Sequence, residues 1–422
     1  MKKKSKRLIG YRVGRVFAVA VAGGLLVTSA ASGSTSGSTK ASIPVGGETS
    51  LTGTFSTFGA QALQGMEAGV YAVNHAGGVL GGRQLNLVVA DDVSDPVDAV
   101  PPAKKLVNVN HVVFENGNAG GQAQAVNKIF TAAHIPFLMP GGDTFFDQNT
   151  NKYIWRLSPS DSQLGVAMAA WARHLGYTRA AVLFRAGDVA QSIVPVVTAA
   201  FKHLGGTITS SQIVQPDLAS YNSEVGKLLA SKPQVIFSET DPPTESVIFR
   251  DLAAAGNTTL PTIGTDDMVG AAMQKGIGIP TSMKLMTNLE AGSFSNPAMS
   301  PFTAAVKAAT HSAPQAGAQN TYDGIIIGAL AIVEAKSTSG PAINNAIPKI
   351  TAPGGVPVYS FAQGVKELRA GKRITYLGAS GSFYFNQYHN VFGPFVAVVA
   401  TASGSYKTLM TLTATDLKKA TP

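Results

Sequence analysis

Loops rich in glycine and polar residues follow three apolar runs that we predict to be strands. They contain Asp91 and Asp92 after residues 84–90, Asn118, Ala119, Gly120 and Gly121 after residues 111–114, and Gly141, Gly142 and Asp143 after residues 135–139. Each loop precedes a predicted helix, and the N–H groups at a helix N-terminus suit a carboxylate. Because the carboxyl ends of parallel strands meet at one edge of a sheet, we expect a binding site there. Capping of the following helices is the alternative role.

Acidic residues follow a second series of predicted strands. They are Asp188 after residues 180–184, Asp241 after residues 234–237, and Asp266 and Asp267 after residues 261–264. A carboxylate in such a place can pair with the ammonium group of a ligand, and a surface or capping role is the alternative. Phe58 lies in a predicted loop after the first strand, where its ring can cover a small ligand or turn into the core.

Signatures of enzymes are weak in this chain. Gly378-Ala-Ser-Gly381 lacks the second glycine spacing of a nucleophile elbow. The seven histidines include no pair at the three- or four-residue spacing of a helical metal site. The glycine-rich loops contain neither GxGxxG nor the lysine pattern of a phosphate-binding loop. We therefore predict a binding protein that is not an enzyme and uses no metal or other cofactor.

Strand and helix patterns alternate along most of the chain. In a predicted helix at residues 61–74, Leu63, Met66, Val70 and Val73 recur on one face. Further helices are predicted at 162–175, 190–204, 221–231, 244–255, 301–309, 319–336 and 341–349, and a β-rich tail at 378–385 and 391–401. This alternation predicts parallel sheets, and two strand series built alike predict an α/β protein with two Rossmann-like lobes.

The charge distribution indicates export. The formal net charge of the 422 residues is +9, but seven of the 33 basic residues precede residue 32, where there is no acid, which leaves 26 basic against 24 acidic residues. We therefore expect no nucleic-acid binding. The cationic start, the apolar run 16–27 and the small residues 28–32 predict a signal peptide at 1–31, followed by a flexible spacer at 32–42. An uncleaved membrane anchor is the alternative.

Cysteine is absent from the sequence. No disulfide can form, and no lipid-modified cysteine can follow the apolar run, so the chain is not a lipoprotein. We expect the mature protein in the periplasm or at the outer face of the cytoplasmic membrane.

Three segments resemble one known family. They are NHAGGVLGGRQLNLVVADDVSDP at 74–96 together with the preceding Leu51-Thr52-Gly53 and Phe58-Gly59, YIWRLSPSD at 153–161, and YLGASGSFYF at 376–385. In this order they are similar to the branched-chain-amino-acid-type periplasmic binding proteins, the solute receptors of ABC importers. The resemblance covers residues 43 to 415.

The resemblance implies a type I fold, in which two lobes are joined by a three-stranded hinge. It places the first lobe at 43–158 and 290–392 and the second at 159–289 and 393–418, with crossings near 157–160, 286–291 and 391–395. It also implies a small-molecule ligand and partners that are the ABC permease and ATPase subunits. We expect a monomer that closes on its ligand.

Carried over residue by residue, the family's pattern places an aromatic lid at Phe58, carboxylate-binding loops at Ala119-Gly120 and Gly141 to Asp143, and an amine-binding acid at Asp266. Relatives often carry serines or threonines where this chain has Ala119, Gly120 and Gly141, and the aromatic position of the second lobe falls near Val189, beside Asp188. These departures argue against an ordinary leucine-type ligand. We expect a small polar solute, such as an amino acid, an amide or a related compound; an exported α/β hydrolase and a ligand-sensing receptor are the alternatives.

Overall fold

A computed structural model describes residues 40–292 and 296–422. The signal peptide predicted at 1–31 and residues 32–39 of the predicted spacer lie outside the described residues. Two larger sheets and one small sheet organise the rest of the chain.

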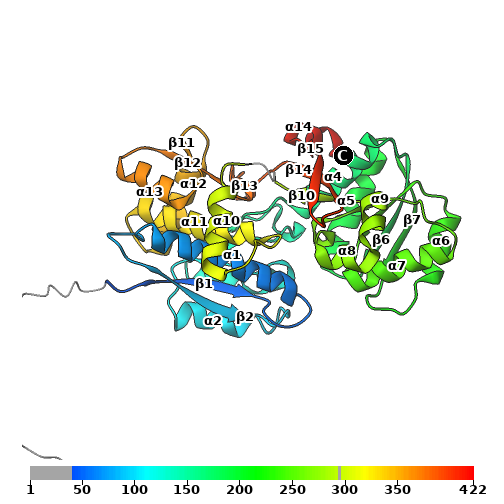
Figure 1. The fold of residues 1–422 in the computed structure, drawn as a ribbon. Coiled ribbons are helices and arrows are strands. Elements are labelled where there is room, and N and C mark those ends of the chain that lie inside the picture. Colours follow the sequence, from blue (N-terminus) through cyan, green and yellow to red (C-terminus); the bar gives the residue numbers. More distant parts are fainter. Residues whose placement is uncertain (1–39, 293–295) are drawn as a thin grey trace, which may run out of the picture. The chain divides into compact units, whose positions relative to one another are not determined.

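The first sheet contains five parallel strands in the order β2-β1-β3-β4-β5. They are β1 (Ile43–Thr49), β2 (Leu85–Asp91), β3 (Glu115–Asn116), β4 (Phe137–Met139) and β5 (Ile154–Arg156). Helices α1 (Ser56–His75) and α11 (Ala318–Ala335) pack on one face, and α2 (Val100–Asn108) and α3 (Gly120–Ala132) pack on the other (Figure 1).

Side chains of β4 show why both faces need a helical cover. Leu138 packs in the core beneath α1 and α11, whereas Phe137 and Met139 pack in the core beneath α2 and α3. Successive side chains of a strand point to opposite faces, so an apolar run buries surface on both. The carboxyl edge of this sheet is left to the polar loops.

The second sheet contains seven strands in the order β15-β14-β10-β9-β8-β6-β7. They are β6 (Arg179–Arg185), β7 (Thr207–Val214), β8 (Val235–Glu239), β9 (Thr262–Gly264), β10 (Met286–Ala291), β14 (Phe395–Ala400) and β15 (Tyr406–Leu412). Pairing is parallel from β7 to β10, whereas β14 pairs antiparallel with β10 and β15. The predicted parallel sheet is therefore mixed at one side.

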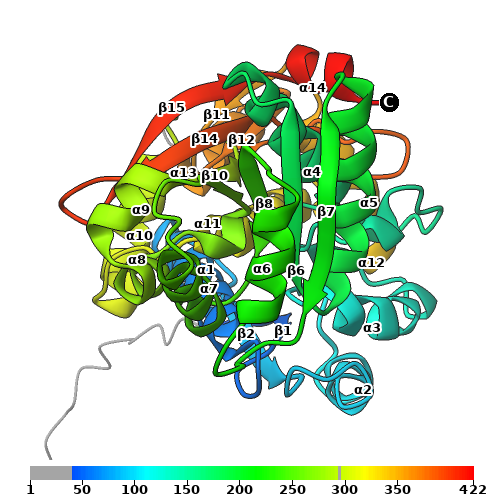
Figure 2. The same cartoon turned by 90° about the vertical axis from the view of Figure 1, so that its right-hand side faces the viewer.

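Helices cover both faces of the second sheet as well. Helices α4 (Asp161–His174), α5 (Asp188–His203) and α14 (Ala414–Ala420) share a core with Val182 and Phe237. Helices α6 (Asn222–Ala230) and α7 (Pro242–Ala254) share the opposite core with Leu183 and Ile236 (Figure 2). This alternation confirms the α/β layering that the strand patterns predicted.

The remaining elements follow β9 and β10. They are α8 (Ala271–Ile277), α9 (Ile279–Leu285), α10 (Met299–Thr310), α12 (Gly340–Thr351), β11 (Val356–Val358), α13 (Phe361–Arg369), β12 (Ile374–Gly378) and β13 (Gly381–Ser382). Asp323 of α11 joins this region to the first core, because its buried carboxylate accepts hydrogen bonds from the hydroxyl of Tyr376 (2.6 Å) and from the N–H and O–H of Ser380 (2.7 and 2.6 Å).

Some predicted elements differ from the structure. Residues 111–114 are not a strand, because the chain turns at His111, whose φ is +51°, and strand pairing begins only at Glu115. Backbone hydrogen bonds from Val113 to Pro44 and from Gly46 to Phe114 still hold this segment beside β1. Strand β7 and the short helices α8, α9, α13 and α14 were not predicted from the sequence. Within residues 40–292 and 296–422, no helix combines the length and the apolar character that a membrane span requires.

Candidate functional site

The structure brings two predicted loops of the first sheet together. A Cβ added to Gly141, after β4, would lie 2.9 Å from the Cβ of Ala119 and 3.5 Å from the nitrogen of Gly120. Ala119 is the N-cap of α3, and no side chain caps this end of the helix. The N–H groups of its first turn are therefore open to a ligand or water.

Asn118 immediately precedes this helix end in a left-handed conformation, with φ of +52°. Its side chain is buried, and neither its amide nitrogen nor its amide oxygen has a hydrogen-bond partner. The amide is near enough to Glu48 to lower the pKa of that carboxyl, although it forms no hydrogen bond of normal geometry with it. A buried carboxamide without partners is costly, so a group that satisfies it would be bound favourably.

Gly142 and Asp143 lead from this loop to Asp161, the first residue of α4. The N–H of Asp161 donates to the carbonyl of Gly142 at 2.7 Å, and a Cβ on Gly142 would clash with the carboxylate of Asp161. The carboxylate of Asp143 accepts from the N–H of Phe145 and from the amide of Gln124. Asp143 thus stabilises the loop after β4 through these hydrogen bonds. Asp161 was not among the site residues predicted from the sequence.

Phe58 lies in the first turn of α1 rather than in a loop, because the helix begins at Ser56. The prediction of a loop position was wrong, although its side chain is 39% exposed and does not turn into the core. Phe55 is similarly exposed just before the helix, and Phe145 is exposed beside Asp143. These rings belong to segments that follow β1 and β4 of the same sheet.

Asp266 and Asp267 form a short 3-10 turn after β9. Burial raises the pKa of Asp161 to about 7, and Asp267 and Asp143 add to the rise. Desolvation by the surrounding protein raises the pKa of Asp266, and the charges of Asp267, Asp161 and Glu290 raise it further. The side chain of Asp266 is exposed, however, and solvent screening therefore limits this rise in pKa. These interactions place Asp161, which begins α4 and is bonded to the Gly142 loop, near the acids that follow β9.

One hydrogen-bond contact joins a loop of the first sheet to a helix that packs on the second. The hydroxyl of Thr144, in the 3-10 turn Thr144–Phe146 after β4, lies 3.2 Å from the hydroxyl of Ser192 on α5. Asp188 begins α5, but its side chain lies outside what the structure describes. The predicted acid at this position therefore stays a prediction.

Arg185, at the end of β6, lies between the carboxylates that end β8. Its guanidinium donates to Glu239 at 3.3 Å and lies 3.8 Å from Asp241. Asp241 also caps α7 by accepting from the N–H and the hydroxyl of Thr244, both at 3.0 Å, so the capping role is present. Burial and the charge of Asp267 raise the pKa of Glu239 to about 8 against the opposing effect of Arg185.

A second group of acids lies inside the first sheet. Glu48 on β1 and Glu115 on β3 are fully buried, and one oxygen of Glu115 accepts the N–H of Glu48 at 2.8 Å. Neither carboxylate oxygen of Glu48 has a partner. Burial and the charge of Glu115 raise the pKa of Glu48 to about 9, and burial raises that of Glu115 to about 8. Both carboxyls are therefore neutral at pH 7.

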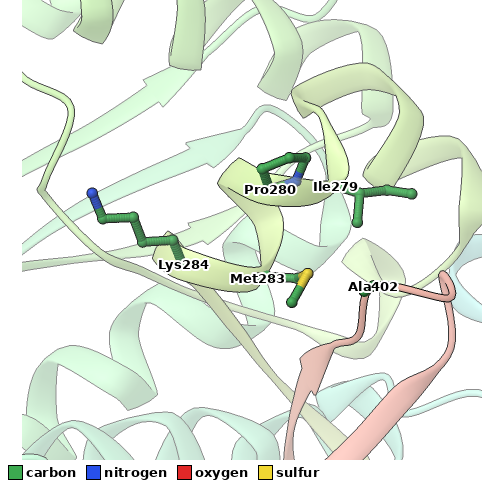
Figure 3. A pocket seen from close by; sticks show the side chains of 5 residues that line it. All are labelled: Ile279, Pro280, Met283, Lys284 and Ala402. Atoms are coloured by element: carbon green, nitrogen blue, oxygen red, sulfur yellow. The ribbon is translucent and has the colours of Figure 1, made fainter.

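Among the described residues, no group of three or more His, Cys, Asp or Glu side chains is arranged to hold a metal ion. A cavity of about 650 Å³ lies at α9 and the turn after β14, and it is lined by Ile279, Pro280, Met283, Lys284 and Ala402 (Figure 3). None of the predicted site residues lines it. The strand-end loops and the acids near Asp161 remain the candidate site.

A sequence model described as "Periplasmic binding protein" matches residues 42–363. The chain belongs to the periplasmic binding protein family. This confirms the family resemblance that the three sequence segments indicated.

Individual relatives in the family are distant. The Leu/Ile/Val-binding protein homolog 1 of Brucella suis biovar 1 (strain 1330) is 26% identical over 225 residues, which are 52% of this chain and 60% of that protein. The match thus spans well under two thirds of the relative's length.

Solved structures of periplasmic binding proteins share the fold. The substrate-binding protein LivJ of the branched-chain amino acid transporter of Streptococcus pneumoniae, in complex with isoleucine, matches with a TM-score of 0.72 at 18% identity, covering 88% of this chain and 98% of that one. An ABC transporter solute-binding protein of R. palustris, in complex with benzoate, matches with a TM-score of 0.70 at 17% identity, covering 88% and 96%. The predicted type I fold is therefore confirmed.

Proposed function

We propose that this protein is the exported substrate-binding component of an ABC importer, and that it binds a small polar solute such as an amino acid, an amide or a related compound. The observation that carries the proposal is that Asp161, at the start of α4, donates its N–H to Gly142 in a loop of the first sheet and also lies near Asp266 and Asp267 of the second. Membership of the periplasmic binding protein family supports it. The protein acts as a monomer, performs no reaction and delivers its ligand to a membrane permease driven by an ATPase.

The proposal includes a division into two lobes. The first comprises residues 43–158 and 290–392 and the second 159–289 and 393–418, after a signal peptide at 1–31 and a spacer at 32–42. Changes of sheet after β5, after β10 and before β14 support these bounds. The proposed ligand-binding residues are Phe58, Asn118, Ala119, Gly120, Gly141, Gly142, Asp143, Asp188, Asp241 and Asp266, to which the geometry adds Asp161 and Asp267.

Binding free energy comes from two sources in such a site. Polar groups of the ligand satisfy donors at the start of α3 and carboxylates of the second sheet, and closure removes apolar surface such as Phe58 from water. Because the ligand binds the native state, it raises the melting temperature in proportion to the logarithm of its concentration above Kd.

Thermal shifts and small-angle scattering test this function. The panel contains the common L-amino acids, their amides, simple amines and aromatic acids, and at least one compound should raise the melting temperature, reduce the radius of gyration and be recovered unchanged. Unchanged dimensions with every compound, together with turnover of an ester or amide, would favour the exported hydrolase instead.

Two variants test the placement of the ligand. With the compound that gives the largest shift, Asp266→Ala should weaken binding by about 2 to 5 kcal/mol, because a buried cationic group loses its partner. Phe58→Ala should cost only about 1 to 3 kcal/mol through lost apolar contact. Full affinity of the Asp266→Ala protein in calorimetry would place Asp266 outside the site.

A further inference from the structure

Two buried carboxyls lie side by side in the first sheet, next to the loop that begins α3. Glu48 of β1 and Glu115 of β3 are fully buried, and one carboxylate oxygen of Glu115 accepts the N–H of Glu48 at 2.8 Å. β1 and β3 pair so that Gly46 lies opposite Glu115, and a Cβ on Gly46 would overlap the other oxygen of Glu115. The glycine therefore makes room for a carboxyl within the sheet.

Both carboxyls point to the face that α2 and α3 cover. Gly46 lies against Val112, which belongs to the core beneath those helices, and side chains two residues apart on a strand share a face, so Glu48 points there too. The groups that act on Glu48 are Glu115, the amide of Asn118 and Asp92. The charged residues within α2 and α3 are exposed lysines: Lys104, Lys105 and Lys128. An ionised Glu48 is thus desolvated among acids, without a cation from either covering helix.

The main chain ties Glu48 to the start of α3. The N–H of Asn118 donates to the carbonyl of Glu48 at 2.8 Å, and a Cβ on Gly117 would overlap that carbonyl. Ala119, the next residue, is the N-cap of α3, where no side chain caps the helix. A change at the end of β1 therefore reaches the open donors of the helix through one residue.

Side chains at this junction have hydrogen-bonding capacity that the protein leaves unused. Within the described residues, both carboxyl oxygens of Glu48, one of Glu115 and both amide atoms of Asn118 lack a hydrogen-bond partner. Asn118 is only 3% exposed, and its amide is near enough to Glu48 to act on the ionisation of that carboxyl. Because buried polar atoms without partners are costly, a small rotation that joins the amide to Glu48 is favourable.

The proton on Glu48 decides which amide atom can face it. A protonated carboxyl can donate its O–H to the amide oxygen of Asn118, whereas an ionised carboxylate can only accept from the amide NH₂ group. The amide oxygen and the NH₂ group lie on opposite branches of the side chain. Protonated Glu48 therefore leaves the NH₂ group of Asn118 free to donate elsewhere, and ionised Glu48 leaves the oxygen instead.

We propose that Glu48 is a positioning residue for the ligand site, whose proton orients the amide of Asn118 so that its NH₂ group adds to the open N–H donors at the start of α3. Loss of the proton turns the amide over and places a negative charge beside these donors, so the affinity for a ligand carboxylate falls. Glu48 acts through Asn118 and does not touch the ligand. The effect on binding rests on the proposed function, whereas the coupling of Glu48 to Asn118 does not.

Burial sets the pH range of the effect. Burial and the charge of Glu115 raise the pKa of Glu48 to about 9, and burial raises the pKa of Glu115 to about 8. The pair is therefore protonated at pH 6.5 and loses its protons above about pH 7.5. By linkage, a carboxylate bound at the start of α3 raises the pKa of Glu48 further and is accompanied by proton uptake in this range.

Carbon-detected NMR of the full chain, labelled at Asn Cγ and Glu Cδ, tests the coupling without a ligand. From pH 6.5 to pH 10 the Asn118 Cγ signal, identified by its absence in Asn118→Ser, should shift with the same midpoint as the Glu48 Cδ signal. In Glu48→Gln the Asn118 signal should stay constant. Glu115→Gln is the matched control: Glu48 remains, so the Asn118 signal should still titrate, at a lower pH because the charge of Glu115 raises the pKa of Glu48.

Calorimetry with benzoate, or with L-glutamine if benzoate does not bind, tests the effect on affinity. The Kd of the parent protein divided by that of Glu48→Gln should rise about five- to tenfold from pH 6.5 to pH 10, and titration of the ligand itself cancels in this ratio. With benzamide the ratio should change much less, because a neutral amide is not repelled by the charge. Asp98→Asn, at an exposed position, should follow the parent protein with each compound.

The outcomes separate this inference from the proposed function. An Asn118 signal that stays constant while Glu48 ionises, or that titrates equally in Glu48→Gln, would overturn the inference. A constant ratio of the two Kd values for benzoate or L-glutamine would also overturn it, and in each case the receptor function would stand. If no compound binds and the protein never contracts, the proposed function fails, and the carbon spectra still decide whether Glu48 controls the amide of Asn118.

Discussion

Replacing Glu48 by glutamine should change how the stability of the protein depends on pH. Glu48 is fully buried on β1, neither of its oxygens has a hydrogen-bond partner, and burial beside Glu115 raises its pKa from 4.5 to about 9. Above pH 4.5 the unfolded chain loses this proton while the folded chain keeps it, so ionisation favours the unfolded state. Stability from this group is fully present below pH 4.5 and is lost as the pH rises towards about 9.

The magnitude follows from proton linkage. Between pH 5.5 and 7.5 the unfolded carboxyl is ionised and the folded one is protonated, so the free energy of unfolding falls by about 1.4 kcal/mol per pH unit, or about 2.7 kcal/mol over this range. This slope requires only that the folded pKa lies above the range. Glutamine is nearly isosteric with the protonated acid and does not titrate, so Glu48→Gln should remove this part of the slope.

Urea unfolding of the full chain, followed by circular dichroism at pH 5.5, 6.5 and 7.5, measures the effect. The free energy of unfolding of the Glu48→Gln protein, minus that of the parent, should increase by about 2 to 3 kcal/mol from the lowest to the highest pH. Titrating groups that do not interact with Glu48 cancel in this difference, and Asp98→Asn, an exposed carboxyl, serves as the control. Parallel stability curves for parent and Glu48→Gln would refute the conclusion that Glu48 is protonated in the folded protein.

Two further variants probe polar groups that hold the first sheet and its surroundings. Asp323→Asn should lower the free energy of unfolding by about 2 to 4 kcal/mol, because an amide cannot accept all the hydrogen bonds that come from Tyr376 and its neighbours; a urea midpoint equal to that of the parent would contradict this. Arg156→Met should cost about 3 to 5 kcal/mol, since it leaves Asp147 without its cation at a site where Arg156 is 1% exposed. Lys372→Met, which removes a lysine that is 57% exposed from its ion pair with Glu367, is the control and should cost much less, about 0 to 1 kcal/mol.

Local patterns were sufficient for most of the architecture. Leu63, Met66, Val70 and Val73 predicted the helix that the structure shows as α1, and the alternation at 84–90 predicted β2. These patterns are reliable because a helix or strand in a layered fold must turn its apolar side chains towards a neighbouring layer. The resulting spacing of apolar residues is visible within a short stretch of sequence. Short elements such as α8 and α9 were missed because a few residues carry too little periodicity.

Local patterns also placed the glycine and asparagine loops at the carboxyl ends of the strands. The structure brings Gly141 against Ala119 and Gly120, as a shared sheet edge requires. The sequence could not say that Phe58 is inside a helix, because a helix start without a capping side chain leaves no local signal.

The sequence by itself therefore determined the class of fold, the family and the edge at which loops gather, because each depends on residues close together in the chain. Only the tertiary structure decided which acids lie near enough to one another to interact electrostatically. Asp161 begins α4, Asp267 follows β9 and Glu290 lies on β10, and none has a sequence pattern that relates it to the others. Their raised pKa values arise only because the fold brings separate elements together, since electrostatic interaction depends on distance in space and on the water that the fold excludes.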